Sequence, residues 1–313
     1  MKTLRLFCSL FVIAMICSCQ PTECCSSKIE KKDIGIQLYS VRDDIKRDFS
    51  GFAETIKAVG EAGYTTIEAA NYGDGKFYGL TPEEFKAAIE AAGMKVLSSH
   101  TSKALNSTDP AAIDWDEIWA WWDQCITAHK DAGMEYIVVP AMSVPETLEG
   151  LKVYCDYYNQ IGEKCKAQGL KFGYHNHAFE FEKRYDLEVE EGARPRRIMM
   201  YDYMLENTNP ELVLFQMDVY WVVRGGQSPV DYFNKYPGRF ELLHIKDNRE
   251  LGQSGMVGFD AIFKNTENTG VKHIIVEVER YSEGSTPIQS IKTSLDYLSA
   301  CPLVKKSYNV ETK

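Results

Sequence analysis

The chain has 313 residues, of which 44% are hydrophobic and 26% charged, which excludes a disordered or collagen-like protein. A chain of this length can bury a core without disulfide support. Its net charge is −10, and its one short basic run is Arg194-Pro195-Arg196-Arg197. Nucleic acid is therefore disfavoured as a partner, because its recognition needs a basic face.

The first residues have the pattern of a lipoprotein signal. A short basic start precedes an apolar stretch over residues 6–16, which is too short to span a bilayer. The stretch ends in Ile16-Cys17-Ser18-Cys19, which resembles a bacterial lipobox. We therefore expect residues 1–18 to be a signal peptide, Cys19 to be lipidated, and residues 19–32 to form a tether. The alternative is a plain secretory signal with incidental cysteines.

On the lipoprotein interpretation, the protein is exported to the periplasm or the cell surface. It would touch the membrane only through its lipid anchor. Four cysteines remain in the body of the chain, at Cys125, Cys155, Cys165 and Cys301. Cys155 and Cys165 lie about 15 Å apart if their segment is helical, so they should not pair. None of the four has zinc-ligand spacing, and we interpret them as free thiols.

From residue 33 onward the chain repeats one unit, a short apolar run followed by a turn and an amphipathic helical stretch. The runs lack strict alternation, as expected for strands covered by helices on one face and packed on the other. Gly63, Gly93, Gly133 and Gly169 each stand where a helix should stop. Thr81-Pro82 marks a helix start. The eight predicted strands are residues 34–39, 66–69, 95–99, 136–139, 171–174, 212–217, 241–245 and 273–278.

Eight such units predict a single-domain (β/α)8 TIM barrel over residues 33–306. An open doubly wound sheet is the alternative, but it would need a Gly-rich phosphate loop after the first strand, which is absent here. Residues 180–209 form a long insertion between the fifth and sixth strands. They follow the C-terminal end of a strand, where barrel active sites are built, so we expect a lip or lid over the mouth.

Polar side chains cluster where the last four predicted strands end. Strand alternation places members of each cluster on one face, pairing His175 with His177 and His244 with Lys246. Carboxylates and imidazoles from neighbouring strands form a mixed nitrogen and oxygen site that suits Mn, Zn, Co or Fe, with the metal acting as a Lewis acid. The four ends read Tyr174-His175-Asn176-His177-Ala178-Phe179-Glu180, Gln216-Met217-Asp218, His244-Ile245-Lys246-Asp247 and Glu277-Val278-Glu279-Arg280.

Each of these residues also has an ordinary structural interpretation. A single His at a strand end is usually a satisfied polar residue. Asp218 can cap the next helix, and Glu277 or Glu279 can serve as an ion-pair partner. Their occurrence together on four strands favours a site, because buried charges without a counter-ion are costly.

Several segments, in order along the chain, carry a family resemblance. They are Gly35-x-Gln37-Leu38-Tyr39-Ser40, Gly63-Tyr64-x-x-Ile67-Glu68, Tyr174-His175-Asn176-His177, Asp218, Trp221 with Gly225-Gly226, His244-Ile245-Lys246-Asp247, and Val276-Glu277-Val278-Glu279. In this order they resemble the sugar phosphate isomerase/epimerase family of xylose-isomerase-like barrels. That family includes inosose dehydratases, hydroxypyruvate isomerases and ketose 3-epimerases.

The resemblance implies a divalent metal held by Glu, Asp, His and Glu from strands five to eight. Asp218, His244 and Glu277 match the last three ligands. The fifth-strand Glu of the family falls at His175, as in a branch with a Tyr-His-x-His pattern. The fourth ligand is therefore either His175 or Glu180.

The resemblance also implies proton abstraction next to the carbonyl of a sugar. The base is Glu277, Glu279 or His177, and Glu180 is a further candidate for the second acid–base group. Lys246 and the metal would stabilise the enediolate. Reprotonation gives an isomer or epimer, whereas a leaving group β to the carbonyl gives elimination by a lyase or dehydratase.

The expected partner is a small carbohydrate, and export favours an unphosphorylated one. Substrate-binding positions are expected at strand ends and loops around the mouth, at Gln37, Glu68, His100, Trp221 and Arg224. Two other classes remain. A family-two AP endonuclease would need more metal ligands and a basic groove. A non-catalytic sugar-binding lipoprotein would not need a complete metal set. The sequence does not indicate an oligomeric state.

Overall fold

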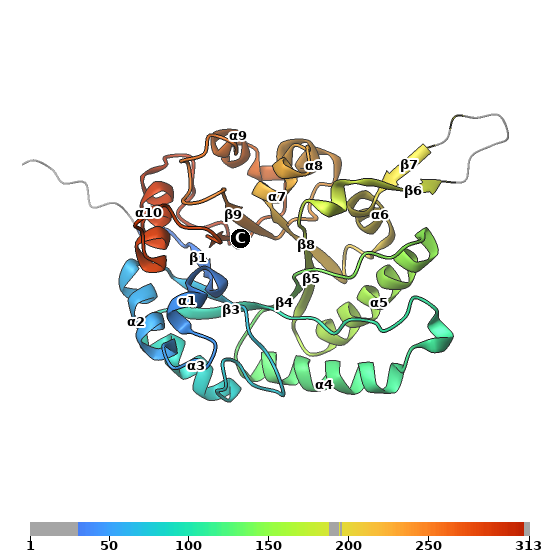
Figure 1. Cartoon of the computed structure of the whole chain (residues 1–313), viewed down its shortest axis with the longest axis horizontal. Helices are drawn as coiled ribbons and strands as arrows, with labels where there is room; N and C mark the ends of the chain where they lie inside the picture. Colours follow the sequence, from blue (N-terminus) through green and yellow to red (C-terminus); the bar gives the residue numbers. More distant parts are fainter. Residues whose placement is uncertain (1–30, 188–193, 195, 310–313) are drawn as a thin grey trace, which may run out of the picture.

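The computed structural model describes residues 31–187, 194 and 196–309. The predicted signal peptide, Cys19 and most of the predicted tether lie outside the described residues. Within them, the predicted barrel is confirmed, since eight parallel strands close in the order β1-β10-β9-β8-β5-β4-β3-β2 (Figure 1). The barrel strands are β1 (Gly35–Gln37), β2 (Thr66–Ala69), β3 (Lys95–His100), β4 (Tyr136–Val139), β5 (Lys171–His175), β8 (Val213–Asp218), β9 (Leu242–Lys246) and β10 (His273–Glu277).

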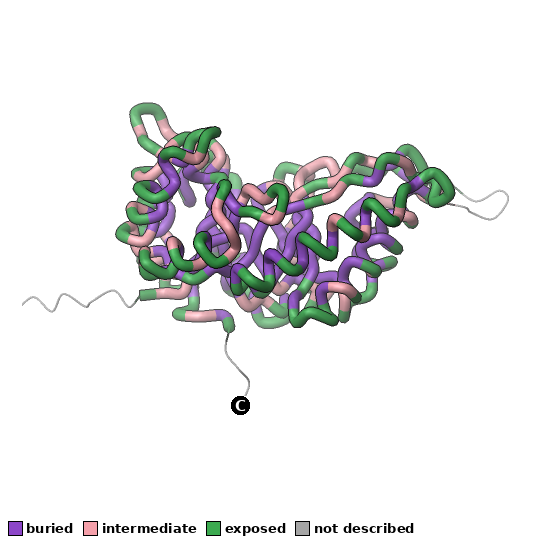
Figure 2. Tube along the Cα trace, turned by 90° about the horizontal axis from the view of Figure 1, so that it is seen from below, coloured by how far each residue is buried: buried purple, intermediate pink, exposed green. Residues whose placement is uncertain are grey.

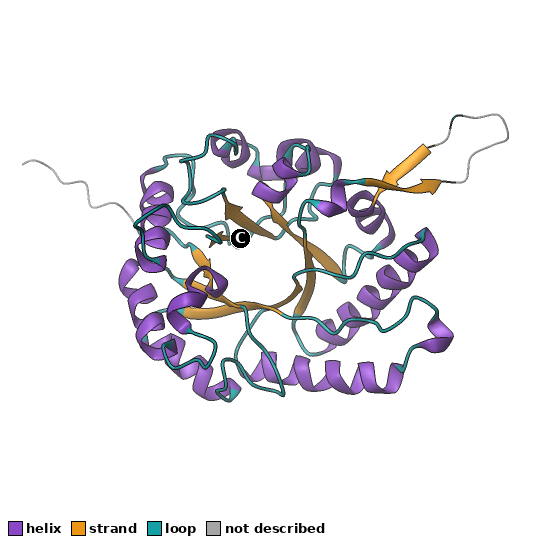
Figure 3. Cartoon of the chain, in the orientation of Figure 1, coloured by secondary structure: helices purple, strands orange, loops and turns teal. Residues whose placement is uncertain are grey.

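Helices surround the strands on the outside of the barrel (Figure 3). The predicted helix stops are confirmed at Gly63, Gly93, Gly133 and Gly169, which all have positive φ. Thr81 forms a capping box with Glu84 at the start of α3. The α-helices are α1 (Arg42–Ile45), α2 (Phe52–Ala62), α3 (Pro82–Ala91), α4 (Trp115–Asp131), α5 (Leu148–Ala167), α6 (Met200–Asn207), α7 (Val219–Arg224), α8 (Pro229–Lys235), α9 (Phe259–Lys264) and α10 (Pro287–Ala300).

The barrel interior has two layers. Alternate residues of each strand point inward, while their neighbours pack under the helices. Toward the strand starts, the inward side chains form a small apolar cluster of Leu97, Tyr136, Val138, Leu214, Leu242 and Ile275. Toward the strand ends, the inward residues are polar, as with Gln216 and His244, which follow Leu214 and Leu242 by two positions. The polar layer therefore rests on an apolar floor.

A β-bulge sits where β2 and β3 meet. The register shifts so that Ile67 pairs with Val96 but Glu68 pairs with Ser98. Leu97 and Ser98 consequently both face the interior, one in the apolar cluster and the other bonded to Glu68. Bulges of this kind redirect side chains near active sites.

The first strand is shorter than the sequence predicts. β1 ends at Gln37, and Leu38–Val41 forms a 3-10 helix instead of continuing the strand. The side-chain oxygen of Gln37 accepts a hydrogen bond from the Tyr39 backbone N–H at 3.0 Å, which turns the chain immediately after the strand.

The insertion after β5 is a hairpin and a helix. β6 (Lys183–Leu187) pairs antiparallel with β7 (Arg196–Met199), and α6 follows directly. The described part of the hairpin extends outward from the rim of the barrel (Figure 1). Of the expected lip or lid, the described residues of the hairpin fit a lip, because they extend outward from the rim and do not lie across the mouth (Figure 1).

Both described ends of the chain meet at the strand starts. The backbone N–H of Asp33 donates to the carbonyl of Lys306 at 2.7 Å. Buried residues fill the interior and the helix–strand interface, with exposed residues outside (Figure 2). Among the described residues, the four cysteines of the body are unpaired. None of the described helices is both long enough and apolar enough to span a membrane.

Candidate metal centre

Five ionisable side chains from four adjacent strands meet at the C-terminal end of the barrel. They are His175 at the end of β5, Asp218 at the end of β8, His244 and Lys246 on β9, and Glu277 at the end of β10. All five are buried, with at most 4% of any residue exposed. The strand pairing places their backbones side by side, since Asp218 is in register with His244 and Glu277 with Lys246.

Four of these residues form a ligand group. His175, Asp218, His244 and Glu277 each offer one atom, and these atoms lie within 4.8 Å of one another. His175 Nε2 lies 3.5 Å from Asp218 Oδ2, and His244 Nδ1 lies 3.4 Å from Glu277 Oε2.

Three of the four ligand atoms are buried without a hydrogen-bond partner among the described residues, namely His175 Nε2, Asp218 Oδ2 and His244 Nδ1. Buried polar atoms are almost always hydrogen-bonded, so unpaired atoms facing one another call for an explanation. A divalent cation would satisfy all three. Two imidazoles and two carboxylates also fit Mn, Zn, Co or Fe.

Neighbouring groups orient the ligand side chains. His175 Nδ1 faces the carbonyl of Pro140 at 3.3 Å, so Nδ1 carries the proton and Nε2 keeps its lone pair. Asp218 Oδ1 accepts the backbone N–H of Trp221 at 2.9 Å and caps α7, which leaves Oδ2 for the cluster. The two interpretations of Asp218, as a helix cap and as a ligand, are therefore compatible.

The electrostatics of the cluster are strongly coupled. Burial raises the pKa of Asp218 to about 6, against the opposing attraction of Lys246. Burial alone would raise the pKa of Glu277, but Lys246 and His244 bring it well below its usual range. Burial would lower the pKa of His244, but Glu68 and Glu277 raise it to about 10. Burial and the neighbouring His244 hold the pKa of His175 well below its usual range. The cluster thus contains carboxylates balanced by cations.

Lys246 lies between two carboxylates at the edge of the cluster. Its ammonium is 2.9 Å from Glu277 Oε2 and 2.5 Å from Glu279 Oε1, and it sits 5.2 Å from the centre of the Trp221 ring. Burial alone would lower the pKa of Lys246, but Glu277 and Asp218 raise it to about 12. The side chain of Glu279 is 29% exposed, which makes it the more accessible of the two carboxylates.

His177 and Trp221 border the cluster and are half-buried. Their ring centres are 5.4 Å apart, and His177 also stacks on Phe179 at 5.9 Å. His177 Nδ1 and Trp221 Nε1 are buried and have no hydrogen-bond partner among the described residues. Burial and the adjacent His175 lower the pKa of His177 to about 3, so its imidazole is neutral.

Glu180 lies outside the four-residue ligand group. Its carboxylate accepts the hydroxyl of Tyr174 and the backbone N–H of His177, both at 2.9 Å. Burial raises the pKa of Glu180 to about 7. Of the two alternatives for the fourth ligand, the structure places His175 in the group and uses Glu180 to hold the loop after β5.

The residues expected to bind substrate separate into two places. Gln37, Glu68 and His100 lie inside the barrel, where Gln37 Nε2 and His100 Nε2 lie 2.8 and 3.0 Å from Glu68 Oε1. Arg224 is exposed, donates to the Tyr220 hydroxyl at 3.1 Å and is not a member of the ligand group.

A second possible ligand group consists of His100, His175 and His244. His100 Nε2 lies 2.7 Å from Gln216 Oε1, and His244 Nε2 lies 2.6 Å from Glu68 Oε1. These nitrogens face acceptor oxygens, so they carry protons and are poor ligands. The group that includes Asp218 and Glu277 is the better metal site.

Sequence reasoning missed Ser98 in this layer and named Gln216 only as a polar strand-end residue, without a role. Ser98 Oγ and Gln216 Nε2 both donate to Glu68 Oε2 at 2.7 Å. The position of Gln216, two residues before Asp218 on one strand, was a usable signal. Ser98 gave none, because only the bulge in β3 turns it inward.

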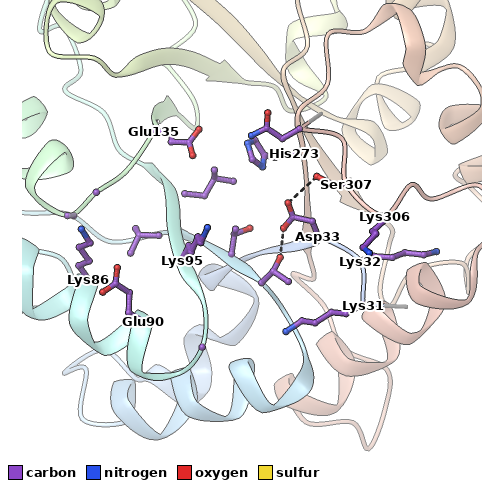
Figure 4. A pocket seen from close by; sticks show the side chains of 18 residues that line it. Lys31, Lys32, Asp33, Lys86, Glu90, Lys95, Glu135, His273, Lys306 and Ser307 are labelled. Carbon is purple, nitrogen blue, oxygen red and sulfur yellow. Dashed lines mark hydrogen bonds between the residues drawn. The ribbon is translucent and has the colours of Figure 1, made fainter. Parts of the chain in front are cut away.

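A cavity of about 940 Å³ opens at the opposite end of the barrel, by the strand starts (Figure 4). Its lining mixes lysines with acidic residues, including Lys86, Lys95, Glu90 and Glu135. Because both lysines and carboxylates line this cavity, its lining does not form a binding surface of a single charge. The candidate site is therefore the polar layer at the strand ends, where the unpaired ligand atoms lie.

Comparison with known proteins agrees with the fold. Residues 56–301 match the family described as the xylose isomerase-like TIM barrel. The chain belongs to this family.

Other xylose isomerase-like barrels resemble the chain over most of its length. Two structures of a sugar phosphate isomerase/epimerase from Parabacteroides distasonis ATCC 8503 superpose with TM-scores of 0.77 and 0.81. They are 35% and 32% identical, cover 88% and 91% of this chain, and are themselves covered over 100% and 99%. An inosose dehydratase from Geobacillus kaustophilus (strain HTA426) is 23% identical over 235 residues, or 69% of each chain.

Proposed function

We propose that the protein is a divalent-metal-dependent sugar isomerase or epimerase. It removes a proton next to the carbonyl of an unphosphorylated sugar or keto-sugar. The observation that carries this proposal is the convergence of three unpaired buried ligand atoms, on His175, Asp218 and His244, beside Glu277. When bound there, a divalent cation supplies Lewis-acid polarisation of the substrate carbonyl.

The groups beside the cluster fit proton transfer. Glu279 is partly exposed and lies 2.5 Å from the Lys246 ammonium, at the edge of the cluster where a carboxylate can accept a substrate proton. His177 borders the cluster, and its Nδ1 has no hydrogen-bond partner among the described residues, so it is the second acid–base group in this proposal. The Lys246 ammonium stabilises the negative charge that develops on the substrate oxygen as the proton leaves.

A lyase or dehydratase is the second candidate. The similarity to an inosose dehydratase favours it. The same residues serve both reactions, because elimination begins with the same proton removal and then expels a group β to the carbonyl. The product decides between the two.

The test is incubation of the Mn²⁺-loaded protein with a panel of keto-sugars and inososes in deuterated water. We expect deuterium at the carbon next to the carbonyl of at least one compound, detected by NMR, and no incorporation after chelation. A new stereoisomer supports the isomerase or epimerase, and loss of a substituent supports the lyase. Absence of exchange in the whole panel, with metal bound, would contradict the proposal.

We also propose that the protein is an exported lipoprotein anchored through Cys19. Its motivation is the sequence Ile16-Cys17-Ser18-Cys19 after a short apolar stretch. Replacing Cys19 with Ala should abolish incorporation of labelled palmitate and move the protein out of the membrane fraction, whereas Cys24→Ala should change neither. Equal labelling of the Cys19→Ala variant and the wild type would overturn the anchor.

A further inference from the structure

The Glu68 carboxylate lies wholly inside the barrel, with no exposed surface. Four side chains from four other strands donate to it, and His100 Nε2 lies 3.0 Å from Oε1 as a fifth neighbour. Gln37 Nε2 and His244 Nε2 lie 2.8 and 2.6 Å from Oε1, and Ser98 Oγ and Gln216 Nε2 each lie 2.7 Å from Oε2. A carboxylate offers about four lone-pair sites, so protein donors fill all of them.

This arrangement leaves Glu68 no capacity to bind a substrate hydroxyl. The convergence of four donors also requires the deprotonated form, which only accepts hydrogen bonds. The bulge between β2 and β3 brings Ser98 opposite Glu68 and fixes the far oxygen. The far oxygen also accepts from Gln216, so Oε1 stays against His244 without the contribution of Ser98.

The contact with His244 decides which ring nitrogen keeps its proton when the other gives up its own to a bound metal. Nε2 faces an oxygen that can only accept, so Nε2 is the donor. Nδ1, on the other edge of the ring, faces Glu277 Oε2 at 3.4 Å and makes no hydrogen bond among the described residues. Nδ1 is the atom that His244 offers to the ligand group.

We propose that Glu68 is a positioning residue for the metal centre. By accepting the Nε2–H of His244, it fixes the ring so that Nδ1 presents its lone pair to a cation shared with His175, Asp218 and Glu277. The role rests on the metal dependence in the proposed function and replaces the expected substrate contact of Glu68. His175 has a matching arrangement, since the Pro140 carbonyl accepts from its Nδ1. Acceptors of this kind orient ligating imidazoles and increase their basicity.

The test compares metal affinity in Glu68→Gln and wild type, measured by calorimetry with Mn²⁺ and Zn²⁺ added to the metal-free proteins. The Gln side chain keeps nearly the same shape but has one acceptor oxygen in place of two. We expect the affinity to fall about 10- to 100-fold, the usual effect of removing an outer-shell partner of a ligating imidazole.

Ser98→Ala is the matched control. It removes a donor from the far oxygen of Glu68 and leaves the contact with His244 intact. We expect it to lower the free energy of unfolding by about 1 kcal/mol, the net value of one hydrogen bond, and to leave metal affinity close to that of wild type. An equal loss of affinity in both variants would show that Glu68 acts only through general packing, and would overturn the proposal.

A second readout uses the unaltered chain, labelled with ¹⁵N in histidine and loaded with Zn²⁺. We expect His244 to show a protonated Nε2 and a metal-shifted Nδ1 in NMR spectra. A metal-bound Nε2 would overturn the proposal. This measurement decides the matter even if Glu68→Gln does not fold.

The outcomes separate the two proposals. A wild-type protein that binds no divalent metal overturns the proposed function, and the role of Glu68 with it. A wild-type protein that binds metal, together with a Glu68→Gln variant of equal affinity, overturns only the role of Glu68.

Discussion

Asp218 uses its two carboxylate oxygens for different purposes, and a substitution can separate them. Oδ1 caps α7, and Oδ2 faces His175. Asp218→Asn keeps a capping oxygen but loses the charge. We expect metal affinity to fall by more than the roughly 100-fold upper range for outer-shell partners. The unfolding free energy of the metal-free protein should stay within about 1 kcal/mol of wild type, because Asn caps helices as well as Asp does.

Asp218→Ala is the companion variant. It removes both functions and should lose about 1 kcal/mol more stability than Asp218→Asn, as lost helix caps do. Urea unfolding and metal titration of both variants check these expectations. Metal binding by Asp218→Asn with wild-type affinity would remove Asp218 from the ligand group.

At the scale of elements, His129 joins α4 to β3 in a fully buried contact. Its Nδ1 lies 2.7 Å from the carbonyl of Cys125, so Nδ1 carries the proton, and Nε2 accepts from Ser99 Oγ at 2.6 Å. Burial lowers the pKa of His129 to about 4, below the usual histidine value of about 6.5. The folded protein therefore binds this proton less readily than the unfolded chain.

The sign of the pH effect follows from this shift. The contribution of His129 to stability is complete above pH 6.5 and decreases as the pH falls toward 4, because the unfolded state takes up the proton first. The loss amounts to at most roughly 3.5 kcal/mol, given about 1.4 kcal/mol per pKa unit. In metal-free urea unfolding, the stability of wild type relative to His129→Gln should therefore decrease between pH 7.5 and 4.5. A pH-independent difference would contradict a neutral buried His129.

The elements themselves were predictable because each has a local cause. Apolar runs specify the strands, and Gly63, Gly93, Gly133 and Gly169 end helices through their own backbone freedom. Two-residue alternation likewise predicted that His244 and Lys246 share a face, whereas the ligand set itself was predicted from the resemblance to the family. The hairpin in the insertion after β5 was not predictable, because no local sequence pattern shows which strand β6 pairs with.

The position of Glu68 illustrates the part that sequence could not supply. Its donors come from strands that start as far apart as residues 35 and 242, and they meet only after the barrel closes. Ser98 joins them through a bulge, and Glu180 leaves the expected ligand set because the nearby Tyr174 hydroxyl and His177 N–H take up its carboxylate. Long-range hydrogen bonding determines these roles.

At the scale of the whole molecule, a bound cation would tie four adjacent strands together. A metal that binds the folded state and not the unfolded state adds about 2.7 kcal/mol to the free energy of unfolding when the free metal concentration is 100 times Kd. We expect chelation to lower the Tm by several degrees, and Mn²⁺ or Zn²⁺ to restore it, in differential scanning calorimetry. Asp218→Asn is the control and should show no shift. A wild-type Tm insensitive to Mn, Zn, Co and Fe would contradict a metal centre in this barrel.

The bond between Asp33 and Lys306 fixes where the chain enters the barrel. It lies at the strand starts, at the far end from the ligand group. A lipid attached at Cys19 would therefore connect the membrane to the end of the barrel where the strands start. The open rim, with Glu279 and Trp221, would face the surrounding medium and meet sugars arriving by diffusion rather than molecules lying in the lipid.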